Sequence, residues 1–71
     1  MTKQQAIEYL TNKIPDDEPV FVFRAQDALA DDVIETWSIR AGSAGCNHDK
    51  VLAARACVDE MRRWPVRKNP D

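Results

Sequence analysis

The spacing of apolar residues is the feature that most constrains the fold of this chain. Apolar side chains recur every three or four residues over three stretches, and the stretches are separated at Pro15, at Gly42 to Gly45, and at Pro65. A period near 3.6 residues is typical of a helix that buries one face, and proline and glycine commonly end helices. Because 71 residues bury only one core, the sequence predicts a single, mainly α domain over residues 1–71 with three helices.

Each predicted helix has a capping residue and one apolar face. The caps and ranges are Thr2 for residues 3–13, Asp27 for a helix that ends near Gly42 or Gly45, and Asn47 for residues 48–64. The apolar faces are Ala6, Ile7, Leu10 and Ile14; then Leu29, Ala30, Val33, Ile34, Trp37 and Ala41; then Val51, Ala54, Val58 and Met61. Asp31, Asp32 and Glu35 are expected to face water. Residues 66–71 show no helical period, which is typical of a frayed end, and the sequence leaves open whether residues 64–71 are ordered.

One short β-strand is predicted between the first and second helices, at about residues 20–24. Val20-Phe21-Val22-Phe23 is a run of β-favouring residues, and no second run of comparable quality occurs in the chain. A strand needs hydrogen-bond partners for its backbone. Pairing with the same segment of another subunit would supply them, so the pattern favours a homo-oligomer, a dimer or larger.

Charge is distributed unevenly along the chain. Residues 1–36 carry eight acids and three bases, whereas residues 37–71 carry seven bases and four acids, which gives net charges of -5 and +3. This polarity fits subunits that pair head to tail, and equally a monomer with internal ion pairs. A DNA-binding protein would carry a broad basic face, and a membrane protein a long apolar run. We therefore expect neither DNA nor membrane binding, and a cytoplasmic location.

The residues that commonly carry chemistry do not form a recognisable catalytic or metal site. Cys46, His48 and Cys57 lack the ligand spacing of zinc sites, and cytosolic cysteines are expected to be free thiols. His48 lies at a helix start, where its protonated form is disfavoured, and it has no orienting third group. No glycine-rich phosphate loop is present. The sequence therefore predicts a protein that is not an enzyme, with no metal and no cofactor.

Two segments contain candidate ligand-binding residues. Arg24, Gln26 and Asp27 lie where the predicted strand leads into the second helix, a place where free backbone N–H groups and side chains converge. The alternative is structural: Asp27 caps the helix and Arg24 pairs with a nearby acid.

The second segment combines a stacking surface with several bases. Its candidate residues are Arg62, Arg63, Trp64 and Lys68. Arginine binds phosphate through a planar fork, and tryptophan stacks on nucleotide bases. The alternative is that Trp64 packs on the core while the bases form a solvated helix end.

The chain resembles a family of small uncharacterised proteins of bacteriophages and prophages. The resemblance rests on Pro19-Val20-Phe21-Val22-Phe23-Arg24-Ala25-Gln26-Asp27, on Trp37, on Trp64-Pro65, on Lys68 and on Pro70-Asp71. It implies a phage origin, where proteins of this size often antagonise host defence. The expected function is a non-enzymatic oligomer that sequesters a nucleotide second messenger of antiviral signalling.

Two other functions remain open. The first alternative is an inhibitor or adaptor that docks on a basic host protein through its acidic surface. That surface would comprise Asp16, Asp17, Glu18, Asp31 and Asp32. The second is a structural or regulatory phage component.

Overall fold

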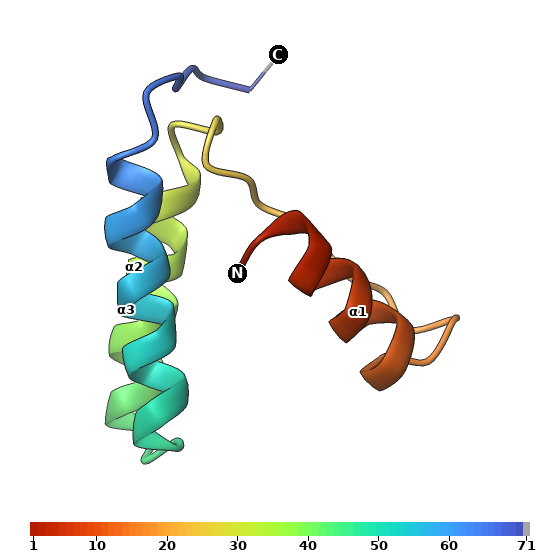
Figure 1. Ribbon diagram of the computed structural model, residues 1–71. Helices are drawn as coiled ribbons and strands as arrows, with labels where there is room; N and C mark the ends of the chain where they lie inside the picture. The colour runs from red at the N-terminus through yellow and green to blue at the C-terminus, as the bar shows by residue number, and fades with distance from the viewer. Residues whose placement is uncertain (71) are drawn as a thin grey trace.

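Two long antiparallel helices form a hairpin, and a third helix lies apart from it on an arm (Figure 1). The computed structural model describes residues 1–70. Over these residues it contains α1 (Lys3–Lys13), α2 (Ala30–Ser43) and α3 (His48–Arg62). The prediction of a small, mainly helical fold with three helices is therefore confirmed. None of these helices is both long enough and apolar enough to cross a membrane.

The limits of α1 follow from its capping residues. The Thr2 hydroxyl accepts a hydrogen bond from the backbone N–H of Gln5 at 3.2 Å, and the Gln5 side chain accepts one from the Thr2 N–H at 2.8 Å. This reciprocal capping box satisfies two of the free N–H groups at the helix start. The helix ends at Lys13 because Ile14 precedes Pro15 and adopts an extended conformation. The predicted range is confirmed.

The first residue of α2 is Ala30, three residues after Asp27, the predicted capping residue. The Asp27 carboxylate accepts a hydrogen bond from the Leu29 N–H at 2.8 Å, and thereby caps a turn that precedes the helix. Leu29 itself is the capping position and makes no side-chain bond there. Asp27 therefore stabilises the entry to α2 one turn earlier than its first helical residue, Ala30.

A tight turn joins α2 to α3. Gly45 adopts a left-handed conformation, with φ of 76°, and the Cys46 N–H donates to the Ala41 carbonyl at 3.0 Å. The Asn47 side chain then accepts from the Asp49 N–H at 2.9 Å, which caps α3 as predicted. The helix ends at Arg62, two residues before the predicted end, because the chain turns at Trp64 ahead of Pro65.

The core lies between the facing sides of α2 and α3. Its buried residues are Ala30, Ser38, Ala41, Val51, Val58 and Met61. The prediction for α3 is confirmed at three of its four positions, with Ala54 partly covered. The prediction for α2 is wrong at Leu29, Val33 and Trp37, each about half exposed. Two helices alone cover only the facing stripe of each, so the edges of the predicted apolar face stay open to solvent.

No strand occurs at residues 20–24, so the prediction of a strand there is wrong. The segment is an extended connection without a paired neighbour in the described chain, and its Phe21 and Val22 are 81% and 72% exposed. The rings of Phe21 and Phe23 pack against each other, with centroids 4.9 Å apart. High β propensity means that the side chains fit a sheet, but a strand also needs a neighbouring strand for its backbone hydrogen bonds. Pairing of this segment across a dimer is therefore left without support.

The arm comprises α1 and the connection that follows it. No Cα atom of α1 lies within 8 Å of a Cα atom of α2 or α3, and none of its residues is buried. The apolar stripe predicted for this helix includes Ile7 and Leu10, both of which remain exposed. Within residues 1–70, the stripe therefore has no helical partner.

Candidate binding site at the open end of the hairpin

The tail after α3 runs beside the entry to α2. Asp27 and Lys68 form an isolated parallel bridge. The Lys68 N–H donates to the Gln26 carbonyl at 2.8 Å, and the Ala28 N–H donates to the Lys68 carbonyl at the same distance. The tail is therefore held against the entry to α2 at Lys68, whereas Asp71 lies outside the described residues. The two segments that carry the candidate binding residues lie side by side in one chain.

Arg67 holds the tail in place. Its Nε donates to the Ala25 carbonyl at 3.1 Å, and its Nη2 donates to the Asp27 carbonyl at 3.0 Å and to Asp31 Oδ1 at 2.8 Å. The guanidinium thus satisfies two backbone acceptors and one carboxylate with a single planar group. Sequence reasoning missed Arg67, because 36 residues separate it from Asp31 and no local pattern links them.

Asp31 is the centre of a charged cluster that also includes Arg62, Arg67 and Glu35. The expectation that Asp31 faces water is wrong: its side chain is only 10% exposed, and its second oxygen accepts from Arg62 Nε at 2.8 Å. Hydrogen bonds from Arg62 and then Arg67 lower the pKa of Asp31 to about 2. The same pairing with Asp31, followed by that with Glu35, raises the pKa of Arg62 above its usual range. Both charges are therefore fixed at neutral pH.

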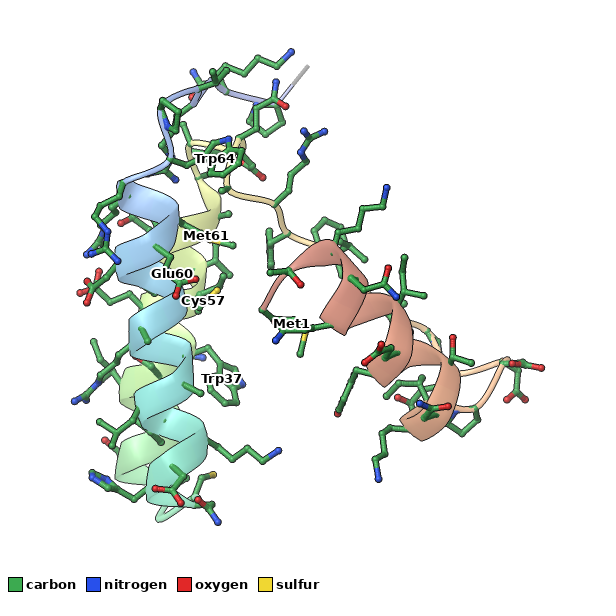
Figure 2. The ribbon with its side chains drawn as sticks, viewed as in Figure 1. Met1, Trp37, Cys57, Glu60, Met61 and Trp64 are labelled. Carbon is green, nitrogen blue, oxygen red and sulfur yellow. The ribbon has the colours of Figure 1, made fainter. Side chains whose placement is uncertain are left out.

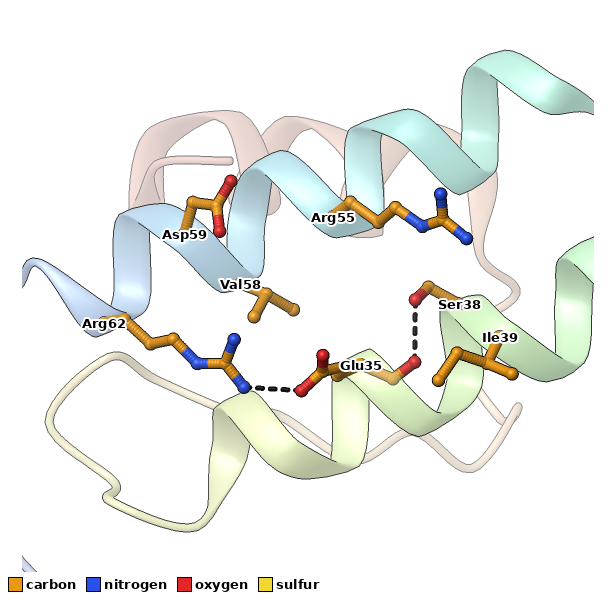
Figure 3. Close-up of a pocket in the computed structure, with 7 residues that line it drawn as sticks. All are labelled: Glu35, Ser38, Ile39, Arg55, Val58, Asp59 and Arg62. Carbon is orange, nitrogen blue, oxygen red and sulfur yellow. Dashed lines mark hydrogen bonds and ion pairs between the residues drawn. The ribbon is translucent and has the colours of Figure 1, made fainter.

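Arg62 belongs to a polar groove on one face of the hairpin (Figure 3). Its Nη2 bonds Glu35 Oε2 at 2.5 Å and lies 3.5 Å from Asp32 Oδ1. The Ser38 hydroxyl donates to the Glu35 carbonyl at 2.7 Å. The groove is lined by two acids and two bases, of which Glu35 and Arg62 pair with each other, so its lining carries no net charge. Arg62, a predicted binding residue, is thus occupied by carboxylates.

The other predicted cations are placed differently. Arg24 and Arg63 are exposed, and neither forms an ion pair with another residue of the described chain. Lys68 is exposed beside the backbone bridge. These side chains belong to the end of the hairpin where the tail meets the entry to α2.

Trp64 lies at the same end of the hairpin (Figure 2). The residue is 54% exposed, so part of its surface remains available for stacking. Gln26 and Asp27 are partly buried next to the bridge. The Asp27 side chain accepts the Leu29 N–H and so holds the turn before α2, whose capping position is Leu29.

The described residues contain no group of three or more histidine, cysteine, aspartate or glutamate side chains placed to hold a metal ion. Cys46 is an exposed free thiol, and Cys57 is a partly covered one. What the open end can offer a ligand is therefore cationic side chains, amide groups and one aromatic face.

Comparisons of the chain with models of protein families, with curated proteins and with solved structures found no match. The chemistry of the side chains is accordingly the basis for a function.

Proposed function

We propose that this chain is a non-enzymatic binding protein of phage type that sequesters an anionic nucleotide, a second messenger of host antiviral signalling, at the open end of its hairpin. Arg24, Arg63 and Lys68 would contact phosphates, and Trp64 would stack on a base. Gln26 would hydrogen-bond a base or ribose edge. Arg62 and Asp27, which are held by intramolecular bonds, would position these groups.

The half-exposed face of Trp64 beside the paired segments is the observation that carries the proposal. A domain with so small a core gains from burying a tryptophan, yet 54% of this residue stays accessible. The ring adjoins Arg63 in sequence and lies on the tail that pairs with residues 26–28. Aromatic and cationic groups in this arrangement suit a base and its phosphate.

Native mass spectrometry of the purified protein with a panel of cyclic and linear nucleotides tests the proposal. We expect one nucleotide class to add its mass to the protein. Trp64→Ala should weaken that binding by about 10-fold or more, because base stacking contributes about 1–3 kcal/mol. Trp64→Phe should retain most of the affinity, because it keeps an aromatic face.

Two arginine substitutions give a matched control. Arg63→Ala removes a cation at the proposed site, and Arg40→Ala removes an exposed cation from the last turn of α2, at the other end of the hairpin. The first should weaken binding and the second should leave it unchanged. Equal affinity of Trp64→Ala, Arg63→Ala and the unmodified protein would exclude this site, and indifference to the whole panel would exclude the function.

Inhibition of a host protein through an acidic surface is the second candidate. The turn that follows α1 carries Asp16, Asp17 and Glu18, all exposed, and it lies at the outer end of the arm (Figure 1). Asp32 is exposed on α2, whereas Asp31 is held by two arginines. Neutralising the three acids of the turn should abolish capture of a host protein under this hypothesis, and should leave nucleotide binding intact under the first.

A further inference from the structure

The two open faces of the hairpin differ in chemistry. Residues two apart on a helix point about 200° apart, so Trp37 and Ile39 of α2 face opposite sides, as do Cys57 and Asp59 of α3. Ile39 and Asp59 line the polar groove. The opposite face carries Val33, Trp37 and Cys57, and we call these three residues the apolar face. Figure 2 shows Trp37 projecting from the hairpin on the side where α1 lies.

The arm carries a second set of uncovered apolar side chains. Ile7 and Leu10 of α1 are exposed, and so are Phe21 and Val22 of the connection. An isolated helix of 11 residues is marginal in water, even with a good cap. Within residues 1–70 α1 receives no support from α2 or α3, so neither helix covers its exposed Ile7 and Leu10.

The accessible area of the chain shows how much surface a partner could cover. A folded monomer of 8.1 kDa exposes about 4,500 Å², whereas this chain exposes 5903 Å². The excess of roughly 1,400 Å² is larger than the ~800 Å² that each partner buries in an interface of standard size. The surplus thus matches a substantial interface.

We propose that a second copy of this chain covers the surplus: α1 of one copy packs against the apolar face of the other copy. The arm of one copy and the apolar face of another copy together form one interface. Each chain therefore takes part in two such interfaces, one through its arm and one through its apolar face. The inference does not depend on nucleotide binding.

Sedimentation equilibrium of two matched variants tests the apolar face. Trp37 and Ile39 lie on the same helix and are similarly exposed, at 52% and 58%. The unmodified protein should sediment as an oligomer, Trp37→Lys as a monomer, and Ile39→Lys as an oligomer. A monomeric unmodified protein at about 100 μM, a concentration well above the dissociation constant of a stable interface of standard size, would overturn the proposal.

A variant in the arm covers the case in which Trp37→Lys fails to fold. Ile7→Lys lies outside the core of the hairpin, so the hairpin should keep its helical circular dichroism while the oligomer dissociates to monomer. An Ile7→Lys protein that remains oligomeric would show that α1 is not part of the interface.

Cross-linking between two differently sized chains identifies which surfaces meet. One chain carries Ile7→Cys with Cys46→Ser and Cys57→Ser; the other carries Cys46→Ser and keeps Cys57. A short bifunctional thiol reagent should produce a heterodimer of the two chains. Moving the arm thiol to the other side of α1, as Asn12→Cys, should reduce the yield several-fold.

The same reagent distinguishes a partner from the chain's own arm. A chain that holds both Ile7→Cys and Cys57 should cross-link into covalent oligomers. Linkage within one chain, at monomer mass, would mean that the arm folds back on its own hairpin and would contradict the proposal.

Discussion

Arg67 and Asp31 join the last segment of the chain to the first turn of α2 through a hydrogen bond of 2.8 Å between Nη2 and Oδ1. The same arginine donates to the carbonyls of Ala25 and Asp27. One side chain therefore fixes the tail, the entry to α2 and the buried carboxylate relative to one another. The proposed nucleotide site lies on the surface that this contact assembles.

Arg67→Gln should release the tail. The substitution removes the charged donor from Asp31 and at least one of two backbone bonds, so we expect the melting temperature to fall by on the order of 10 °C. Arg63→Gln is the control, because Arg63 is exposed and pairs with no other described residue. Differential scanning calorimetry measures both, and similar melting temperatures for the two variants would contradict the role of Arg67.

Acid should weaken the fold through Asp31. Its pKa is lowered from 3.8 to about 2 by Arg62 and Arg67, so the ionised form stabilises the folded state at any pH above about 4. That contribution is lost as the pH falls from about 4 to about 2. Thermal unfolding of the unmodified protein and of Asp31→Asn, followed by circular dichroism, should show a difference in melting temperature that shrinks over this range. A difference that stays constant down to pH 2 would disagree with the linkage.

The two glycines should respond to alanine in opposite directions. A Cβ at Gly42, inside α2, would lie 4.0 Å from Val51 Cγ1, an ordinary contact, so Gly42→Ala should stabilise the protein by about 0.5–1 kcal/mol. Gly45 has φ of 76° with open space around it, so Gly45→Ala should destabilise it by about 1 kcal/mol through backbone strain alone. Urea unfolding of both variants provides the test. Shifts of the same sign would contradict the assignment.

Enlarging Ala30 should disturb the contact between α2 and α3. Ala30 has no exposed surface, so Ala30→Leu should cost about 1–3 kcal/mol by overpacking. Ala53→Leu makes the same change at an exposed position of α3 and should stay within about 0.5 kcal/mol of the unmodified protein. Urea unfolding compares the two variants through their midpoints, provided that the dependence of the unfolding free energy on urea concentration is the same in both. An equal loss of stability in both variants would contradict overpacking at Ala30, because it would show that leucine destabilises the helix regardless of position.

Local features of the chain could be predicted well from sequence. Thr2 and Asn47 cap α1 and α3 as expected, and Val51, Val58 and Met61 are buried. These features depend on interactions within a few residues or on a strict helical period. The candidate binding segments could be named, but their adjacency could not, since it depends on contacts between residues about 40 apart in the chain.

The predictions that failed concerned contacts between elements. Local sequence patterns do not determine which segment a strand pairs with or which side of a helix is covered. Residues 20–24 have the composition of a strand and remain unpaired in the described chain, because propensity does not supply a neighbouring backbone. Trp37 has the spacing of a core residue and is half exposed, since a two-helix hairpin covers only one stripe of each helix.

The sequence by itself determined where the helices of this protein begin and end, to within a few residues, and that it folds as a small, mainly helical domain. Capping, helical period and proline act over short distances, so residue order is enough to place them. The tertiary structure alone decided that Asp31 is held between two arginines, that Arg67 and Lys68 bond to the entry to α2, and that α1 stands apart. Each of these depends on how segments distant in sequence meet in space. Those contacts decide which side chains are buried and which charges are paired.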